Sequence, residues 1–301
     1  MGILEKIRAV FASGSSNLAA SGKLDVESRF ERLRSAVSGT MSNFQAMREI
    51  QTGRVVGVKL LDIEKYRNFE NRFKGLKKPS EGYIAKRMKH PNVMETYEFG
   101  FTTKRQPYVI TEYIDGPGLQ QLIQSANEEL VRPHRLNITR QMAAALQYVH
   151  ESGFIHRDIC PRNFICSKDL TLVKLIDFGL TVPAEPVFMQ PGNRTGTPLY
   201  MAPEIVRRKA TDQRVDVFSF GVSIYSWYTF RFPWDVRDTS GKAALNHDTT
   251  PPKEILTLLP KLNPLLAKAI MRCLQPDIMQ RMSSMVAFLQ AIAAVDRDFD
   301  D

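Results

Sequence analysis

Three polar side chains, Asp158, Asn163 and Asp177, have the types and the spacing that metal-assisted catalysis requires. Asp158 and Asn163 belong to one short stretch, and Asp177 follows the apolar run 172–176, which is typical of a short strand. One carboxylate can orient or deprotonate a nucleophile, and an amide with a second carboxylate supplies the hard oxygen ligands that Mg²⁺ prefers. The sequence therefore predicts a catalytic carboxylate beside a Mg²⁺ site.

The stretch FIHRDICPRN (residues 154–163) and the turn DFG (177–179) resemble the catalytic and metal-binding loops of the eukaryotic-type serine/threonine protein kinase family. The resemblance covers roughly residues 35–292, with the motifs in the family's order. It implies an α+β fold of two lobes, a small, mostly β N-lobe with one regulatory helix and a larger, mostly α C-lobe. It also implies ATP and Mg²⁺ as cofactors, with Asp158 orienting the substrate hydroxyl and Asn163 and Asp177 holding the metal.

The resemblance also implies a nucleotide site. VGVK (56–59) matches the strand whose lysine, Lys59, binds the α and β phosphates, and Glu81 matches the glutamate that pairs with this lysine. Residues 108–114 match the hinge, where the backbone of Glu112 and Ile114 would bond adenine. The remaining nucleotide-binding positions implied are Gly39, Phe44, Gly57, Thr111 and Ile165.

The loop that covers the phosphates departs from the family pattern. The motif GxGxxGxV falls on residues 37–44, where only the middle glycine, Gly39, is kept. Glycines allow backbone amides to approach phosphates closely. The loss leaves open a pseudokinase that works as a nucleotide-binding or scaffolding module.

Two further departures lie on neighbouring strands of the expected sheet. Phe44 stands where a valine usually caps adenine, and Gly57 stands where an alanine usually does. A larger group beside a smaller one would keep the pocket's volume nearly constant. We expect Phe44 to fill the space over Gly57 and to stack on adenine.

The catalytic stretch lacks the lysine that serine/threonine kinases carry two residues after the catalytic aspartate. Cys160 occupies that position, whereas Arg162 occupies the place of an arginine found in many tyrosine kinases. We expect Arg162 to take the lysine's role, although the two cations differ in reach and geometry. Cys160 is either an inert thiol, which we favour, or an oxidation-sensitive one with a lowered pKa.

Residues 177–204 resemble an activation segment that binds a protein substrate. GTPLY (196–200) resembles the serine/threonine form, in which Thr197 contacts the catalytic aspartate. Because this resemblance outweighs the tyrosine-kinase character of Arg162, we expect serine/threonine specificity. A kinase-fold enzyme acting on a small molecule is a weaker alternative. Arg157 implies control by a phosphate in the segment, and Thr195 is the candidate site of autophosphorylation.

Several helices must hold this site in place. The clearest is expected over 135–151, with a core face of Ile138, Met142, Leu146 and Val149, and it leads directly into the catalytic stretch. Further helices are expected over 65–76, from near Pro79, from Leu119 and from Asp216 to Trp227, and three strands between residues 34 and 59.

The resemblance implies supporting contacts for these elements. Asp216 would hydrogen-bond the catalytic-loop backbone, and His156 would pack behind Phe178 as a structural residue. Glu204 and Arg281 would form a buried ion pair, which is costly to break from either side.

Length and composition place the chain among globular proteins. It has 301 residues, 43% hydrophobic and 24% charged, without an apolar run long enough for a membrane span. Three cysteines are too few for a disulfide framework, and we expect a cytoplasmic protein. The net charge of +9 would suit acidic partners, but we favour a solvated basic face as its explanation, and no nucleic-acid-binding motif accompanies it.

The expected domain organisation has three parts. Residues 1–24 combine an amphipathic helix with a linker, and docking on the protein itself is favoured over peripheral membrane contact. The kinase domain spans 25–292, with an N-lobe of about 30–112 and a C-lobe of about 116–292. Residues 293–301 are expected to form a frayed acidic tail.

Overall fold

The computed structural model describes residues 23–33, 37–38, 42–192, 195–235 and 243–299. They divide into two units, each described here by itself. The strand-rich unit contains the described residues up to Phe69 together with Thr96–Tyr113, and the helical unit contains Glu70–Glu95 and the described residues from Ile114 onward. A smaller, mostly β part and a larger, mostly α part confirm the expected fold class.

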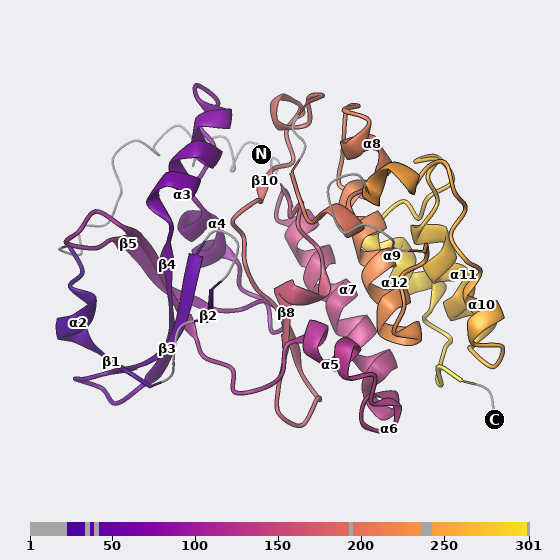
Figure 1. Cartoon of the computed structure of the whole chain (residues 1–301), viewed down its shortest axis with the longest axis horizontal. Helices are drawn as coiled ribbons and strands as arrows, with labels where there is room; N and C mark the ends of the chain where they lie inside the picture. The colour runs from indigo at the N-terminus through magenta and orange to yellow at the C-terminus, as the bar shows by residue number, and fades with distance from the viewer. Residues whose placement is uncertain (1–22, 34–36, 39–41, 193–194, 236–242, 300–301) are drawn as a thin grey trace, which may run out of the picture. The chain divides into compact units, whose positions relative to one another are not determined.

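The strand-rich unit is built on an antiparallel sheet in the order β1-β3-β4-β6-β5, with β2 paired to β3 (Figure 1). Alternate residues of these strands face one core, which includes Met47, Val56, Val58 and Ile110. The elements are α2 (Val26–Arg29), β1 (Phe30–Arg32), β2 (Val37–Ser38), β3 (Ser42–Glu49), β4 (Val55–Leu61), α3 (Ile63–Glu70), β5 (Thr96–Phe101) and β6 (Pro107–Glu112).

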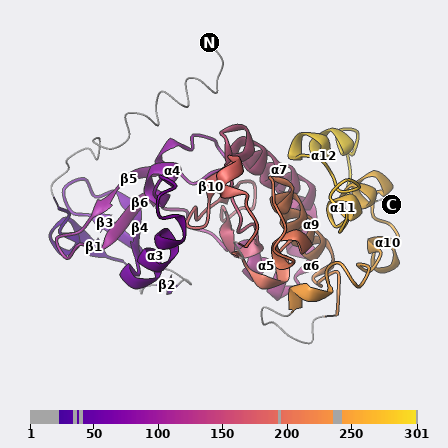
Figure 2. The ribbon, with the colours of Figure 1, turned by 90° about the horizontal axis from the view of Figure 1, so that it is seen from above.

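The helical unit is built around two long helices, α7 and α9, which lie side by side (Figures 1 and 2). A hydrogen bond from Trp227 Nε1 to the Arg135 carbonyl joins them. The predicted core face of α7 is fully buried. Helix α9 is buried from Val215 to Tyr228, because apolar side chains lie on every side of it, with a few buried polar residues among them. The helices are α4 (Glu81–Arg87), α5 (Leu119–Ser125), α6 (Glu128–Val131), α7 (Arg135–Glu151), α8 (Pro203–Val206), α9 (Arg214–Thr229), α10 (Ile255–Leu258), α11 (Pro264–Cys273) and α12 (Met285–Ala291).

Short strands and 3₁₀ helices carry the functional loops of this unit. The strand pairs are β7 with β10 and β8 with β9, both antiparallel. These elements are η1 (Asn71–Phe73), η2 (Arg132–His134), β7 (Phe154–Ile155), η3 (Pro161–Asn163), β8 (Phe164–Cys166), β9 (Val173–Leu175), β10 (Val182–Pro183), η4 (Pro186–Phe188), η5 (Pro198–Tyr200) and η6 (Ala243–Asn246).

The helix expected over 65–76 is shorter than predicted. The α-helix ends at Glu70, and η1 replaces the remaining turns, because Asn71 favours helix ends and Gly75 adopts a φ of +87°. The next helix begins as expected, since the Ser80 side chain accepts a hydrogen bond from the Tyr83 amide and caps α4.

The N-lobe boundaries expected from the sequence differ from the observed division. Glu70–Glu95 belongs to the helical unit, although it precedes β5 in the chain. The reason is a set of hydrogen bonds around Asn92. Its side chain donates to the Val173 carbonyl and to Gln141, and its carbonyl accepts from the Leu175 amide. Strands β1 and β5 were not predicted, because neither has a clear alternating pattern.

The expectation of a frayed acidic tail is wrong for residues 293–299. Val295 is fully buried, and Phe299 forms a bridge with Leu262 and lies 4.9 Å from the Arg132 guanidinium. Arg140 also donates hydrogen bonds to the carbonyls of Ile292 and Val295. The apolar residues between the aspartates bind this segment to the helical unit, and the acidic composition concealed them.

No helix in the described part of the chain is long and apolar enough to cross a membrane. Residues 1–22, which include the predicted amphipathic helix, lie outside the described residues, so the docking of residues 1–24 stays a prediction.

Candidate active site

Asp158 lies at the centre of a hydrogen-bonded cluster in the helical unit. Its Oδ1 accepts from the Thr197 backbone amide at 2.9 Å and from the Thr197 hydroxyl at 2.7 Å. Its Oδ2 accepts from Asn163 Nδ2 at 3.0 Å, and the same nitrogen donates to the Asp158 carbonyl at 2.6 Å. The carboxylate therefore has a fixed orientation, and the expected contact between Thr197 and Asp158 is confirmed.

Arg162 extends this cluster. Its Nη2 donates to the Thr197 hydroxyl at 3.0 Å, so the cation, the hydroxyl and the Asp158 carboxylate form one chain of hydrogen bonds. Arg162 is exposed on the first helical turn after Cys160, where η3 begins at Pro161. The positive charge expected near the site is thus present, at the position that the sequence indicated.

Cys160 lies beneath the cluster as a buried thiol. Burial, reinforced by the nearby Asp158 charge, raises the pKa of Cys160 to about 11, against the opposing effects of Thr197 and Arg162. The alternative of a lowered pKa is therefore wrong, because the loss of solvent outweighs the neighbouring cation. The thiol stays protonated near neutral pH.

Asp216, in α9, binds the backbone of the catalytic loop. Its carboxylate accepts from the backbone amides of His156 and Arg157 at 2.7 and 2.8 Å and contacts His150 Nε2 at 2.9 Å. Burial alone would raise the pKa of Asp216, but these hydrogen bonds and the neighbouring histidines hold it below its usual value. The expected bond from Asp216 to the loop is confirmed, whereas no motif in the sequence indicated His150.

His156 is the spacer that the sequence predicted. Its ring is fully buried and meets the Phe178 ring edge-on at 5.3 Å between centroids. Burial lowers the pKa of His156, although the surrounding aspartates oppose this, and its Nδ1 accepts a hydrogen bond from the Asp158 amide. A neutral ring with that bond is a structural element and not a general base.

Asn163 and Asp177 have a donor set that fits a Mg²⁺ ion. Both hydrogen bonds of the Asn163 side chain use Nδ2, so its Oδ1 is available as a ligand. The Ile176 amide donates to the Asn163 carbonyl at 2.8 Å, which places Asp177 next to Asn163. An amide oxygen and a carboxylate are the hard ligands that this ion takes, with other positions left for phosphates and water.

Glu81 is near the DFG turn within the same unit. A Cβ atom added at Gly179 would lie 3.3 Å from Glu81 Oε2 and 3.1 Å from Asp177 Oδ1. Glu81 is buried at the first position of α4. Of the other predicted residues in this unit, Ile165 lies in β8 opposite Lys174, and Ile114 is half-buried after β6.

The remaining nucleotide-site candidates lie on β3, β4 and β6 of the strand-rich unit. Phe44 pairs with Lys59, and Gly57 pairs with Thr111. A Cβ atom added at Gly57 would lie 2.4 Å from Phe44 Cζ and 2.7 Å from Thr111 Oγ1. The prediction that Phe44 fills the space over Gly57 is therefore confirmed.

Two further residues of the predicted nucleotide site, Glu112 and Gly39, belong to the same part of the sequence. Glu112 pairs with Val56 at the end of β6. Gly39 lies outside the described residues.

Comparison with known proteins identifies the family. Residues 30–292 match the protein kinase domain. The chain belongs to the protein kinase family. It is 29% identical over 267 residues to a probable serine/threonine-protein kinase of Clostridium acetobutylicum. The aligned region covers 87% of this chain and 39% of the relative. It is also 29% identical over 228 residues to a serine/threonine-protein kinase of Myxococcus xanthus, which covers 72% of this chain and 41% of the relative.

A probable serine/threonine-protein kinase of Streptomyces coelicolor is 29% identical over 247 residues, 79% of this chain and 36% of the relative. The kinase chain thus spans about two fifths of the length of these relatives.

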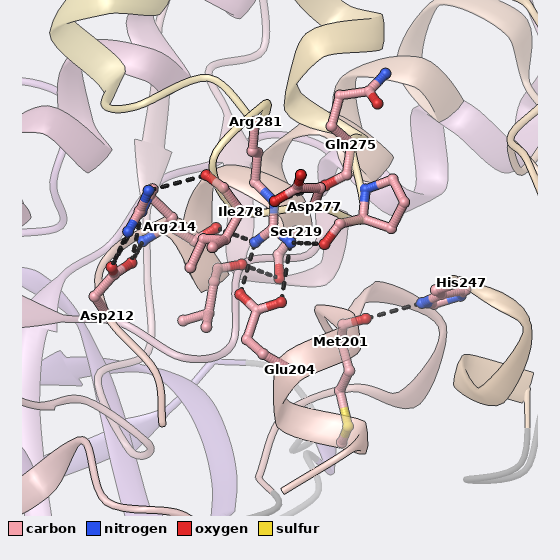
Figure 3. Close-up of polar contacts among 12 residues, drawn as sticks. Met201, Glu204, Asp212, Arg214, Ser219, His247, Gln275, Asp277, Ile278 and Arg281 are labelled. Atoms are coloured by element: carbon pink, nitrogen blue, oxygen red, sulfur yellow. Dashed lines mark hydrogen bonds and ion pairs between the residues drawn. The ribbon is translucent and has the colours of Figure 1, made fainter. Parts of the chain in front are cut away.

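The activation segment of the kinase ends in a buried ion pair that the sequence predicted. Glu204 and Arg281 form two hydrogen bonds, at 2.7 and 2.9 Å, with both residues almost fully buried (Figure 3). Arg281 also donates to the carbonyls of Gln275 and Arg214, so its charge is well satisfied. The pair fixes the segment's last residues to the loop after α11.

Two further contacts in this part of the kinase were not predicted. His247 Nδ1 contacts the Met201 carbonyl at 2.8 Å (Figure 3). The His247 ring also stacks on Trp234. The Ser219 hydroxyl donates to the Tyr200 carbonyl at 2.7 Å. Neither residue belongs to a motif with an evident chemical role, so spacing in the sequence did not indicate them.

Arg157 of the kinase is a buried cation with spare hydrogen-bonding capacity. Its Nη2 donates to the Phe188 carbonyl and to Thr211 Oγ1, whereas Nε and Nη1 have no partner among the described residues. Burial lowers the pKa of Arg157, although Asp216 opposes this shift and arginine remains charged in proteins. Thr195, the candidate phosphorylation site, is buried in this structure.

Proposed function

We propose that this protein kinase is active and transfers the γ-phosphate of ATP to serine or threonine hydroxyls of a protein. The observation that carries the proposal is the pair of hydrogen bonds from Thr197 to Asp158 Oδ1. With Asn163 on Oδ2, three of about four lone-pair positions of the carboxylate are occupied. The remaining one, on Oδ2, would accept the proton of the substrate hydroxyl.

Asn163 and Asp177 would hold Mg²⁺ in this reaction. The bound ion would neutralise charge on the phosphates of ATP as the γ-phosphate is transferred. Because the Asn163 amide nitrogen is bonded to Asp158, one residue would fix the metal ligand and the catalytic carboxylate relative to each other. This coupling supports positioning as the main contribution of the loop.

The nucleotide itself would be bound by residues that the family resemblance implies. Lys59 would contact the α and β phosphates, and Glu81 would hold this lysine in place. The adenine would lie beside Phe44, Gly57, Thr111 and Ile165 and would bond the backbone of Glu112 and Ile114, with Gly39 in the loop that covers the phosphates. The close fit of Phe44 over Gly57 supports the adenine side of this arrangement.

We further propose that Arg162 replaces the lysine that Cys160 displaces. The bond from Arg162 to the Thr197 hydroxyl supports this role, because it places the cation one side chain away from Asp158. A guanidinium there would attract the transferring phosphate and orient it through paired N–H donors.

We also propose control through the activation segment, and the unfilled donors of Arg157 support this proposal. A phosphate on Thr195 would supply strong acceptors for Nε and Nη1 of this arginine. Thr195 is buried, so its autophosphorylation would require the segment to move first.

We also infer a cytoplasmic protein with a protein substrate as its partner. All three cysteines are free and buried, which suits a reducing compartment. The turn Thr197–Tyr200 and the buried ion pair of Glu204 hold the end of the activation segment in place. A fixed segment of this kind supports a protein substrate rather than a small-molecule substrate.

Phosphate transfer from labelled ATP in the presence of Mg²⁺ tests the proposed function. The acceptors are the kinase itself and a generic basic protein, and the controls are Asp158→Asn and Lys59→Met with folding checked by circular dichroism. We expect transfer to serine or threonine at least a hundredfold above the controls. Transfer no greater than that of the folded controls would instead support a pseudokinase that works as a scaffold.

A further inference from the structure

The activation segment of this kinase has an aromatic anchor at Phe188. This residue ends η4 and is 4% exposed. Its ring lies 6.0 Å, centroid to centroid, from the ring of Phe73, which is 6% exposed. Two large apolar side chains are therefore buried against each other, one from the activation segment and one from the segment that precedes α4.

The backbone of the anchor is bound to the catalytic loop. The Phe188 carbonyl accepts from Arg157 Nη2 at 2.7 Å, and the Met189 carbonyl accepts from the Thr211 amide at 3.0 Å. Thr211 Oγ1 accepts from the same Arg157 nitrogen at 3.2 Å. Phe188 is therefore connected to the catalytic loop, because its carbonyl is bonded to Arg157 and Arg157 directly precedes Asp158 in the chain.

The other side of the contact is equally well fixed. The Lys78 ammonium lies 5.7 Å from the centre of the Phe73 ring, 2.9 Å from Glu70 Oε1 and 3.0 Å from the Pro79 carbonyl. The Lys78 side chain is only 1% exposed. These contacts join the turn around Phe73 to Glu70 at the end of α3 and to the chain just before α4.

This turn leads directly to Glu81. Ser80 caps α4, and Glu81 is the first residue of that helix. Glu81 also approaches Gly179 at the start of the activation segment. The segment that carries Glu81 therefore meets the activation segment at two places, the DFG turn and Phe188.

We propose that Phe73 and Phe188 are positioning residues of this kinase, whose ring contact holds the activation segment in order without a phosphate on it. The contact consists of two apolar rings, and Phe188 is joined to Arg157 through a backbone carbonyl, so the anchor needs no modified residue. A phosphate on Thr195 would add to an ordered segment through the unfilled donors of Arg157. The inference rests on the proposed kinase function.

Activity measurements on the full chain test this proposal, with the variants Phe73→Ala, Phe188→Ala and their combination. Phe188→Leu keeps an apolar side chain at the anchor. Phe288→Leu is the control, because Phe288 is buried against Phe220 in the core between α9 and α12, away from the activation segment. All proteins are treated with phosphatase, checked by mass spectrometry and assayed below their lowest melting temperature.

We expect phosphatase-treated wild type to keep its activity within about threefold. Each alanine variant should lose at least tenfold in kcat/KM for a peptide substrate. The double variant should lose little more than either single one, because both remove the same contact. Phe188→Leu should recover most of the loss, and Phe288→Leu should stay within about twofold of wild type even if its melting temperature falls.

Amide hydrogen exchange gives a readout that does not need activity. Phe73→Ala and Phe188→Ala should accelerate exchange over residues 182–192 and at the Thr211 amide, whereas Phe288→Leu should not. Loss of wild-type activity on phosphatase treatment overturns the proposal, and so does unchanged exchange in folded alanine variants. Wild type without transfer above Asp158→Asn contradicts the proposed function instead, and the exchange data then decide whether the anchor exists.

Discussion

Thr197 and Asp158 are joined by two hydrogen bonds that end on the same oxygen, Oδ1 of the carboxylate. Residues far apart in the chain thereby fix one another, because the bond partners come from the catalytic loop and from the activation segment. A displaced activation segment would release the carboxylate, so the order of the segment and the geometry of the catalytic group are linked.

Replacing Thr197 by valine should lower kcat by about tenfold to a hundredfold. The change keeps the shape and the backbone bond but removes a hydroxyl donor to a charged acceptor, which contributes about 1.5–3 kcal/mol. Thr197→Ser keeps the hydroxyl and should stay within a few-fold of wild type. Steady-state kinetics with a peptide substrate provide the measurement, and equal rates for the valine and serine variants would contradict it.

Replacing Arg162 by methionine should lower kcat more than it raises KM for ATP. The cation would act on the phosphate during transfer, and this contribution is lost with the charge. Arg162→Lys should recover part of the rate, since lysine keeps the charge but not the paired donors. Arg208→Met, at an exposed arginine after α8, is the control for net charge. Full activity of Arg162→Met would exclude the proposed role.

Gly57→Ala should destabilise the strand-rich unit and weaken ATP binding. The added methyl would lie 2.4 Å from Phe44 Cζ and 2.7 Å from Thr111 Oγ1, and such overpacking costs about 1–3 kcal/mol. Combining it with Phe44→Val should restore much of the loss. Thermal unfolding and calorimetric titration with ATP measure both effects. If neither single change altered nucleotide affinity, the paired-volume interpretation would be refuted.

Breaking the buried pair of Glu204 and Arg281 should destabilise the helical unit strongly. Arg281→Met leaves the Glu204 carboxylate buried and unpaired, which costs about 3–5 kcal/mol in the free energy of unfolding. Arg207→Met breaks an exposed pair with Asp248 and should cost far less. Urea denaturation of both variants measures the difference, and similar midpoints would argue against burial as the cause.

The three cysteines should react slowly with iodoacetamide in the folded kinase. Burial raises the pKa of Cys160 to about 11 and the pKa values of Cys166 and Cys273 to about 12. Only about one thiol in a thousand at Cys160 is then deprotonated at pH 8, and the thiolate is the reactive form. Mass spectrometry after labelling at pH 8, with and without urea, checks this. Fast native labelling of Cys160 would show that the thiol is activated.

Much of the fold follows from local patterns. Helix α7 has its predicted bounds, because its apolar residues recur at helical spacing before the catalytic stretch. The contact of Phe44 with Gly57 was also predicted, since the family resemblance implied that a larger and a smaller residue replace two neighbouring residues of the adenine pocket.

Contacts that depend on tertiary packing were harder to predict. Nothing in the sequence indicated that Phe73 and Phe188 would meet, because aromatic residues in loops have no period that points to a partner. The environment of Cys160 was also uncertain, since burial and a nearby arginine shift the pKa of a thiol in opposite directions. Only the structure shows that burial dominates.

The bonds from Arg140 in α7 to the carbonyls of Ile292 and Val295 have a consequence for synthesis on the ribosome. The partners lie 152 and 155 residues apart in the chain. The strand-rich unit is complete once Tyr113 has left the exit tunnel, whereas the helical unit lacks acceptors for Arg140 until its final segment emerges. All residues of the first unit are therefore synthesised before the acceptors of Arg140, and the second unit stays incomplete during this interval, when exposed apolar surface favours misfolding.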